Sequence, residues 1–190
     1  MPTIDAVMGS DCVHGGCRVL AGDGTSTFAA TTSDGAEELP RGDLRVSDVS
    51  PDGTLWAVDT IPDVTHQFGC AGLYDPRTDR VVAKNCETSN LTFSPDGRHL
   101  LGTRGDNNMY DELTVLDDDL SVVGAYAPKA EAVSRAAWAD DGHLLAATVN
   151  LEDNRWSLVR VAADGSGPEV VAGPAAGRNP EMIAEFQLSN

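Results

Sequence analysis

The sequence VSPDGTLWAV at residues 49–58 recurs twice more in this 190-residue chain. The second copy is FSPDGRHLLG at residues 93–102, and a more divergent third copy is WADDGHLLAA at residues 138–147. The interval from Ser50 to Ser94 is 44 residues, and the interval from Ser94 to Ala139 is 45. This period is typical of a four-stranded repeat unit, whereas the common helical repeats are shorter, at roughly 33 or 34 residues.

Each copy predicts two strands joined by a tight turn. An apolar residue precedes the Ser-Pro-Asp-Gly segment and an apolar run follows it, which is the pattern of a β-hairpin. Proline presets φ for the turn, aspartate can bond the backbone ahead of it, and glycine accepts a positive φ. Trp56, Phe93 and Trp138 flank these turns, so we expect them to pack in the core.

The remainder of each period predicts a second hairpin. Apolar segments lie on both sides of turn-forming residues at 76–79, 117–119 and 163–167. Since no segment shows helical periodicity, each period contains four short strands. The sequence therefore predicts an all-β fold, a β-propeller of about four four-stranded antiparallel blades, either partial or unusually small.

The period also predicts where the blades lie within a single domain, 1–190. The predicted blades are 1–43, which is divergent, 44–88, 89–132 and 133–180. Residues 183–189 resemble the strand that precedes the repeated turn, so they are predicted to form a terminal strand.

The net charge is −17, from 30 acidic and 13 basic residues. Such a field repels phosphate backbones and anionic lipid surfaces, so nucleic-acid binding is disfavoured. A solvated acidic surface explains the charge, and a specific site for cations or a basic partner is the alternative. No apolar run reaches the about 18 residues of a membrane span, and residues 1–6 do not form a signal peptide.

Four cysteines form two close pairs, Cys12 with Cys17 and Cys70 with Cys86. An even number in local pairs predicts two disulfides, although free thiols or a metal site stay open as alternatives. Disulfides would place the protein outside the cytoplasm, in the periplasm, secreted or at the cell surface.

The hairpin register supports the second pair. If this hairpin turns about Thr78, Tyr74 faces Val82 and Cys70 faces Cys86. Facing residues in an antiparallel pair have Cα atoms about 4.5 to 5.5 Å apart, which a disulfide can span.

The turns at 50–53 and 94–97, with the degenerate turn at 139–142, resemble the TolB-like family of WD-related propeller repeats. The resemblance covers residues 44 to 150 well and the flanks loosely. It implies a fold found in periplasmic and secreted binding proteins, and in the non-catalytic gating domain of prolyl-oligopeptidase-like peptidases. The chain is also similar to disulfide-bearing propellers of exported actinobacterial proteins, through Cys70 and Cys86.

The chain departs from that family in its number of blades. Closed TolB-like propellers usually have about six to eight, whereas this chain has about four. It is therefore predicted to be a fragment, one half of a dimeric ring, or an unusual four-bladed propeller that the terminal strand closes. In each case ring closure would protect the exposed blade edges.

No catalytic motif is found, so we expect no enzyme activity and no cofactor. A serine hydrolase would need Gly-x-Ser-x-Gly between a strand and a helix, but residues 165–167 lie in a predicted hairpin turn. Phosphate-binding glycine motifs are absent. No recognisable triad spacing relates the four histidines, His14, His66, His99 and His143.

Two acidic segments, 106–108 and 117–119, are candidates for calcium binding. Neither follows the alternating ligand pattern with a closing glutamate, so solvated turns are the favoured interpretation and no metal site is predicted.

Recognition is expected in the loops between the second and third strands, which vary most from period to period. These variable loops are residues 62–68, 105–111 and 151–155. We predict a non-catalytic scaffold for a protein or small-molecule ligand, and the alternative is a regulatory or gating fragment of a larger peptidase or hydrolase. Plain connecting loops also remain open. The candidate binding residues are His66, Asp106, Tyr110, Asp111, Glu152 and Arg155.

Overall fold

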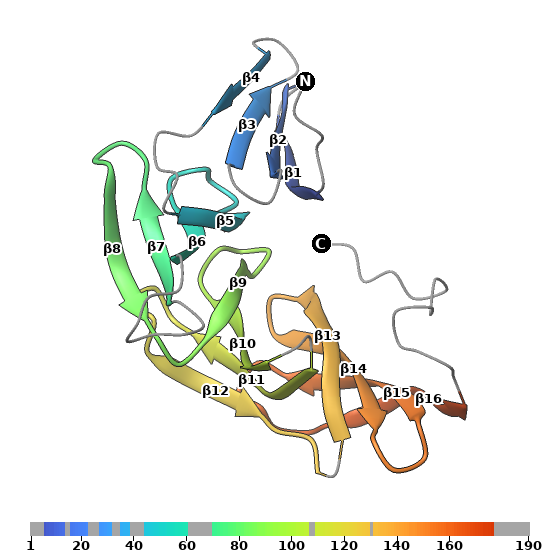
Figure 1. Ribbon diagram of the computed structural model, residues 1–190. Helices are drawn as coiled ribbons and strands as arrows, with labels where there is room; N and C mark the ends of the chain where they lie inside the picture. Colours follow the sequence, from blue (N-terminus) through green and yellow to red (C-terminus); the bar gives the residue numbers. More distant parts are fainter. Residues whose placement is uncertain are drawn as a thin grey trace. The chain divides into compact units, whose positions relative to one another are not determined.

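The computed structural model describes residues 6–13, 16–22, 27–31, 35–38, 44–60, 70–106, 109–129 and 131–176, with side chains in 44–60, 70–104, 109–129 and 131–176 (Figure 1). Every regular element in these ranges is a β-strand, and neighbouring strands are antiparallel. The predicted all-β class is correct. The chain divides into two compact units, Met1–Phe93 and Ser94–Asn190.

The first unit contains two four-stranded sheets and one further strand. One sheet has the order β1 (Ala6–Val13), β2 (Gly16–Gly22), β3 (Thr27–Thr31) and β4 (Gly35–Glu38). The other has the order β5 (Leu44–Val49), β6 (Trp56–Thr60), β7 (Ala71–Asp75) and β8 (Arg80–Asn85). The unit ends with β9 (Ser89–Phe93).

The second unit contains seven strands. They are β10 (Leu100–Asp106), β11 (Met109–Leu116), β12 (Val122–Tyr126), β13 (Glu131–Asp140), β14 (His143–Asn150), β15 (Arg155–Ala162) and β16 (Glu169–Ala176). Within this unit the sheet order is β16-β15-β14-β13-β11-β10, and β12 also pairs with β11. None of the sheets formed by the described strands is closed. Each period thus contains four strands, as predicted. The single domain and the blade bounds stay a prediction.

The first repeated turn is built around the Ser50 hydroxyl group. Ser50 Oγ donates a hydrogen bond to Asp52 Oδ1 (2.7 Å) and accepts one from the Leu55 N–H (2.9 Å). The backbone closes through Ser50 N–H to the Leu55 carbonyl (2.8 Å) and Gly53 N–H to the Ser50 carbonyl (2.7 Å). Gly53 has φ +72°, a conformation that glycine adopts without steric cost.

The second turn repeats this arrangement. Ser94 Oγ donates to Asp96 Oδ1 (2.7 Å) and accepts the His99 N–H (3.0 Å), while Gly97 has φ +71°. Ser94 is completely buried, so the two hydrogen bonds satisfy its hydroxyl group away from water. Local turn chemistry therefore explains why these segments recur.

The third turn is shorter because alanine replaces the serine. Ala139 has no hydroxyl group, and β13 continues to Asp140, which lies opposite His143 at the start of β14. The Asp140 carboxylate accepts the Gly142 N–H (2.9 Å) and so closes the turn instead. The segment is a hairpin as predicted, but a different side chain holds it.

Each unit has its own hydrophobic core. In the first, Trp56 and Tyr74 pack with ring centroids 5.6 Å apart, beside three aliphatic residues, Leu44, Val46 and Val58. In the second, half-buried Trp138 packs against a cluster formed by Leu101, Leu113, Val115, Val133, Leu144, Ala146 and Val161. The tryptophans beside the repeated turns lie where the pattern predicts.

Side chains of β5 hold the backbone of β9. Ser47 Oγ donates to the Leu91 carbonyl (2.9 Å), and Asp48 Oδ2 accepts the Phe93 N–H (2.7 Å). Ser47 is the extra residue of a β-bulge between Val46 and Asp48, which leaves its hydroxyl group available to the neighbouring strand. These bonds satisfy backbone groups of β9 on the side that faces β5.

A second carboxylate on β6 acts in the same way. Asp59 Oδ1 accepts the Asn90 N–H (3.2 Å). Burial raises the pKa of Asp59 and of Asp48 above the ordinary value of 3.8, although their backbone hydrogen bonds and, for Asp59, the Arg45 charge oppose the shift. Two half-buried carboxylates therefore join β9 to the preceding sheet.

In the second unit, the turn at 163–167 packs tightly against β12. Ala163 N–H donates to the Gly142 carbonyl (2.8 Å). A Cβ atom on Gly165 would lie 2.7 Å from the Ala125 carbonyl carbon, and one on Gly124 would lie 2.7 Å from the Asp164 Cα. Both glycines are therefore required by the close approach of two backbones.

We predict that Gly165→Ala destabilises the protein by about 2–4 kcal/mol, because the added methyl group collides with the Ala125 backbone at a positive φ. Gly167→Ala is the matched control. Its φ is +59° but nothing lies within 4 Å of its Cβ position, so the loss should be only about 1 kcal/mol. Urea denaturation measures both, and equal losses would contradict the packing argument.

Candidate functional site

The variable loops of the second unit are shorter than predicted. β10 extends to Asp106 and β11 begins at Met109, so Tyr110 and Asp111 lie in a strand and not in a loop. Hydrogen bonding between β10 and β11 continues past Gly105 through a bulge, which the sequence pattern does not reveal. The predicted extent of this loop, 105–111, is therefore wrong.

Tyr110 contributes mainly to packing. It pairs with Val133 on β13 and lies half-buried against the core of the second unit, as does Tyr126. Burial and the neighbouring Glu131 charge raise the pKa of Tyr126 above 10.0. Asp111, by contrast, is exposed on β11.

The turn between β14 and β15 comprises residues 151–154. The Asn150 side chain accepts the Glu152 N–H (2.9 Å), and the Asn150 carbonyl accepts the Asn154 N–H (2.9 Å). These bonds fix the turn and leave Leu151 62% exposed, the largest value among the exposed large apolar side chains of the described residues. Glu152 and Asp153 are also exposed, so this turn presents one apolar and two acidic side chains to solvent.

Arg155 begins β15 and has a structural partner. Its guanidinium group donates to the Pro174 carbonyl on β16 (3.1 Å), and its N–H donates to Asp153 Oδ1 (3.1 Å). Two other predicted residues cannot be placed in a site: His66 lies outside the described residues, and Asp106 is described only as backbone at the end of β10.

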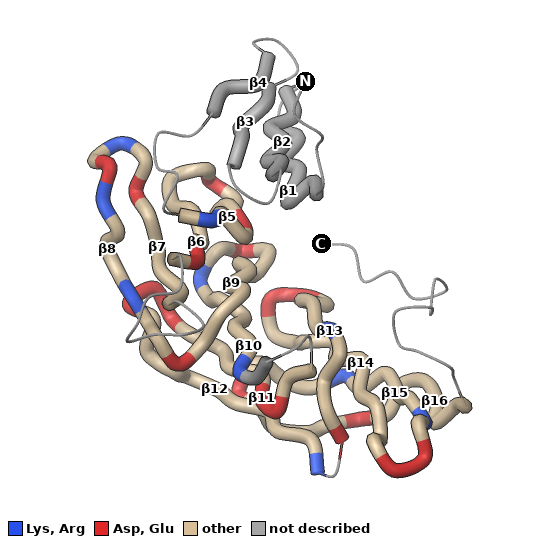
Figure 2. Tube along the Cα trace, in the orientation of Figure 1, with Lys and Arg blue, Asp and Glu red and all other residues tan. Residues whose placement is uncertain are grey.

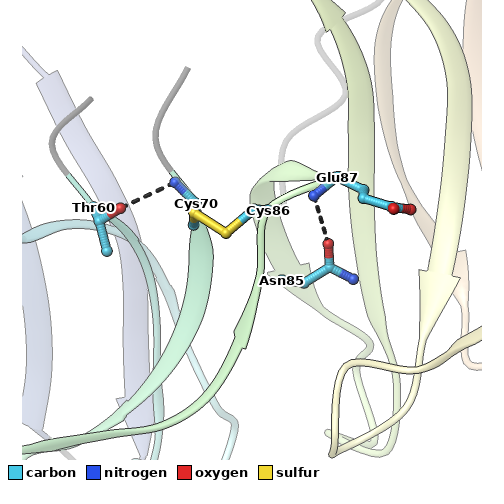
Figure 3. Close-up of a disulfide and its surroundings, with 5 residues drawn as sticks. All are labelled: Thr60, Cys70, Asn85, Cys86 and Glu87. Atoms are coloured by element: carbon cyan, nitrogen blue, oxygen red, sulfur yellow. Dashed lines mark hydrogen bonds between the residues drawn. A yellow bond between two sulfur atoms is a disulfide. The ribbon is translucent and has the colours of Figure 1, made fainter. Parts of the chain in front are cut away.

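The predicted disulfide between Cys70 and Cys86 is present (Figure 3), with a Cα–Cα distance of 4.1 Å. Cys70 is also held on β6, because its N–H donates to Thr60 Oγ1 (3.0 Å) and its carbonyl accepts the Thr60 N–H (2.9 Å). Beyond the disulfide, Glu87 N–H donates to Asn85 Oδ1 (2.8 Å). These contacts fix the base of the β7–β8 hairpin.

The register predicted for the β7–β8 hairpin is correct only near the disulfide. Leu73 faces Ala83 as predicted, but a bulge follows and Tyr74 faces Val81, not Val82. In the first sheet, Cys12 lies opposite Cys17 in the β1–β2 register. Their side chains lie outside the described part, so the second disulfide stays a prediction.

The aspartates of the 117–119 turn bind their own backbone. Asp117 Oδ1 accepts the Ser121 N–H (3.0 Å), and Asp119 Oδ1 accepts the same group (2.8 Å). Hydrogen bonds from Ser121 and Asp117 lower the pKa of Asp119. Where side chains are described, no three acidic, histidine or cysteine groups are arranged to hold a metal ion, while residues 107–108 of the other candidate lie outside.

A charged cluster at the third turn was not predicted. Asp140 Oδ1 lies 2.8 Å from His143 Nδ1, and Asp140 Oδ2 accepts a hydrogen bond from Arg160 (3.1 Å). Hydrogen bonds from His143, then Gly142 and Arg160, lower the pKa of Asp140 to about 2. The sequence shows Asp140 and His143 on either side of a turn, which could have predicted their contact. Arg160 joins them only because β15 pairs with β14, which the sequence does not show.

None of the described residues forms a helix long and apolar enough to cross a membrane.

No family model and no curated protein matches this sequence. Solved structures do match. The β-propeller domain of the Trilobed protease from Pyrococcus furiosus, reported with an open velcro topology, has a TM-score of 0.61 at 10% identity, over 92% of this chain and 59% of that chain. The putative TolB from Agrobacterium tumefaciens gives 0.60 at 13% identity, over 82% and 60%.

The acylaminoacyl peptidase of Pyrococcus horikoshii gives a TM-score of 0.59 at 12% identity, over 90% of this chain and 32% of that chain. At these identities the likeness shows the fold, which is a β-propeller. This chain spans less than two thirds of the length of each of these three structures.

We predict that replacing both Cys70 and Cys86 by alanine lowers the free energy of unfolding by about 3 kcal/mol, as expected for a sequence separation of 16 residues. Cys86→Ala alone, measured under reducing conditions, separates loss of the bond from loss of the side chain. Peptide mapping without reduction should recover the two cysteines linked, and recovery of both as alkylated thiols would contradict the structure.

We also predict that the carboxyl group of Asp140 titrates near pH 2 and that His143→Ala moves its pKa up toward 3.8, because its strongest hydrogen bond is lost. A lowered pKa in the folded state stabilises the protein above pH 3.8, and this contribution disappears as the pH falls through about 2. Carbon NMR of the carboxyl groups measures both values. Asp164, held by Ser166, serves as the control and should not move.

Proposed function

We propose that this β-propeller is a non-catalytic scaffold that binds a protein or small-molecule ligand outside the cytoplasm, through its variable loops. The observation that carries the proposal is that the repeated turns and the turn at 151–154 use their side chains differently. The repeated turns use their serine and aspartate side chains to hold the backbone, whereas the turn at 151–154 exposes Leu151 and Glu152 to solvent. A repeated framework with variable, exposed loops is how repeat proteins form recognition surfaces.

The serine and histidine side chains at the repeated turns are hydrogen-bonded to neighbouring aspartates, which supports a non-catalytic role. The Ser50 and Ser94 hydroxyl groups are hydrogen-bonded to Asp52 and Asp96 within their turns. His143 is paired with Asp140 at the third turn. A catalytic serine would instead need a neighbouring histidine base with its hydroxyl group open to substrate.

The disulfide between Cys70 and Cys86 supports a location in an oxidising compartment. The fold shared with a putative TolB is consistent with a binding protein.

A second candidate function is a regulatory or gating propeller of a larger peptidase. The likeness to two proteases favours it, and this chain matches only 32% of the length of the acylaminoacyl peptidase. The two candidates differ in what accompanies the propeller. A native polypeptide that continues into a Gly-x-Ser-x-Gly segment would favour the gating role.

A loop variant tests the leading proposal. Purified protein is immobilised and exposed to an extract of secreted and periplasmic proteins, and the bound proteins are quantified by mass spectrometry. Asp111→Lys with Leu151→Ser should reduce captured partners at least about tenfold, because Leu151 is exposed in the turn at 151–154 and Asp111 is exposed near the start of β11, beside the other loop region.

Val82→Ser, at an exposed position of β8, is the matched control and should capture as the wild type does. Capture that is unchanged in the loop variant would contradict the proposal. Labelling of the wild type by a fluorophosphonate probe for activated serines would contradict its non-catalytic part.

A further inference from the structure

The disulfide between Cys70 and Cys86 joins a buried residue to an exposed one. Cys70 lies directly before β7 and is only 2% exposed, whereas Cys86 lies directly after β8 and is exposed. A disulfide opens when a thiolate attacks one of its two sulfur atoms, and access to each sulfur helps to decide which one is attacked. The two ends of this bond therefore differ in a property that controls its chemistry.

The strand order gives this difference a direction. β8 is an end strand of its sheet, and no described strand pairs with its other edge. A thiolate approaches in line with the bond, opposite the sulfur that leaves, so it reaches Cys86 from this free side. In-line approach to Cys70 comes from the side of β6, where Thr60 Oγ1 accepts the Cys70 N–H (3.0 Å) (Figure 3).

The charges beside Cys86 are balanced, although the chain as a whole has a net charge of −17. β8 carries two exposed basic side chains, Arg80 and Lys84, which Figure 2 shows along its trace. Glu87, the residue after Cys86, is acidic and exposed. A negatively charged field repels an approaching thiolate, and the two cations reduce this repulsion next to Cys86.

We propose that Cys86 is a site of reversible modification by a low-molecular-weight thiol. The thiolate sulfur forms a bond to Cys86 Sγ as the bond between Cys86 Sγ and Cys70 Sγ breaks. Cys70 Sγ leaves with the electron pair and takes a proton from water. The incoming sulfur is oxidised to a mixed disulfide and Cys70 is reduced to a thiol, so no further oxidant or reductant is required.

The hairpin keeps the two sulfur atoms close after the bond has opened. Ala71 pairs with Asn85 and Gly72 with Lys84 through the backbone, and Thr60 holds the Cys70 backbone from the other side. The Cys70 thiolate can then attack Cys86 Sγ, which re-forms the disulfide and expels the modifying thiol. The modification does not involve the variable loops, so it is independent of the proposed ligand binding.

Two effects on the site of attack oppose each other. A buried thiolate is a poorer leaving group than an exposed one, which favours attack at Cys70 with departure of Cys86. Access favours attack at Cys86, because Cys70 is buried and β6 lies on its far side. The proposal states that access decides, and the partition of the modifying group between the two cysteines measures this directly.

The test exposes the wild-type protein to 2-mercaptoethanol, which has no charged group besides its thiolate. The reaction is stopped with acid at a series of short times, and the freed thiol is alkylated with N-ethylmaleimide. Trypsin cleaves after Arg77, Arg80 and Lys84, so mass spectrometry reads the two cysteines on separate peptides. Extrapolated to zero time, the adduct should lie on Cys86 at least about tenfold more often than on Cys70.

The same reaction in concentrated urea is the matched control, where the partition should fall to within about twofold of equality because access no longer differs. An equal partition in the folded protein, or an excess on Cys70, would overturn the proposal. So would the lack of any adduct on the folded protein at times when the unfolded protein is modified, because the fold would then protect both sulfur atoms.

A second measurement tests the charge argument. Arg80→Gln with Lys84→Gln should slow attack by 3-mercaptopropionate, whose thiolate form carries two negative charges, about two- to threefold more than attack by 2-mercaptoethanol. Equal slowing of the two thiols would remove the role assigned to these cations.

Discussion

The rest of the structure depends on how each repeated turn is closed by a side chain that bonds its own backbone. In the first two repeats a buried serine hydroxyl group both donates to an aspartate and accepts a backbone N–H, which leaves no polar atom of that side chain unsatisfied. The turn sets the pairing of the strands it joins, so Val49 on β5 lies opposite Trp56 on β6. In the third repeat the serine is absent, and the Asp140 carboxylate at the end of β13 accepts the Gly142 N–H and closes a shorter turn. The constraint is conserved across the repeats although the chemistry is not.

Local chemistry also explains which parts of the fold could be predicted. A turn motif and a period depend on neighbouring residues, and both are visible in the sequence. The facing of Cys70 and Cys86 follows from counting residues back from the turn, and it holds because the register is regular from Leu73 to the disulfide. The bulge at Tyr74 was not predictable, because an extra residue in a strand leaves the alternation of apolar and polar residues almost unchanged. The bulge at Ser47 was hidden for the same reason, and with it the hydrogen bonds that hold β9.

The candidate site was predicted less well than the fold, for related reasons. Tyr110 was assigned to a loop because residues 105–111 vary from period to period, but strand pairing continues through that region and half-buries the ring. Arg155 was assigned to recognition, whereas its guanidinium group bonds the Pro174 carbonyl. The cluster of Asp140, His143 and Arg160 was missed because it needs the pairing of β14 with β15 as well as the turn. Long polar side chains carry little information about their partners until the register is known.

The outer strands β8, β12 and β16 bury few apolar side chains, so other contacts must hold them to their sheets. β8 alternates between exposed and half-buried residues, and most of β12 and β16 is exposed, so none of the three can be held by apolar burial alone. Each has a different additional contact. The disulfide ties β8 to β7, the glycine-mediated approach of the 163–167 turn covers β12, and the Arg155 side chain bonds the second half of β16. The cysteine pair is thus one of several local contacts that hold an outer strand to its sheet.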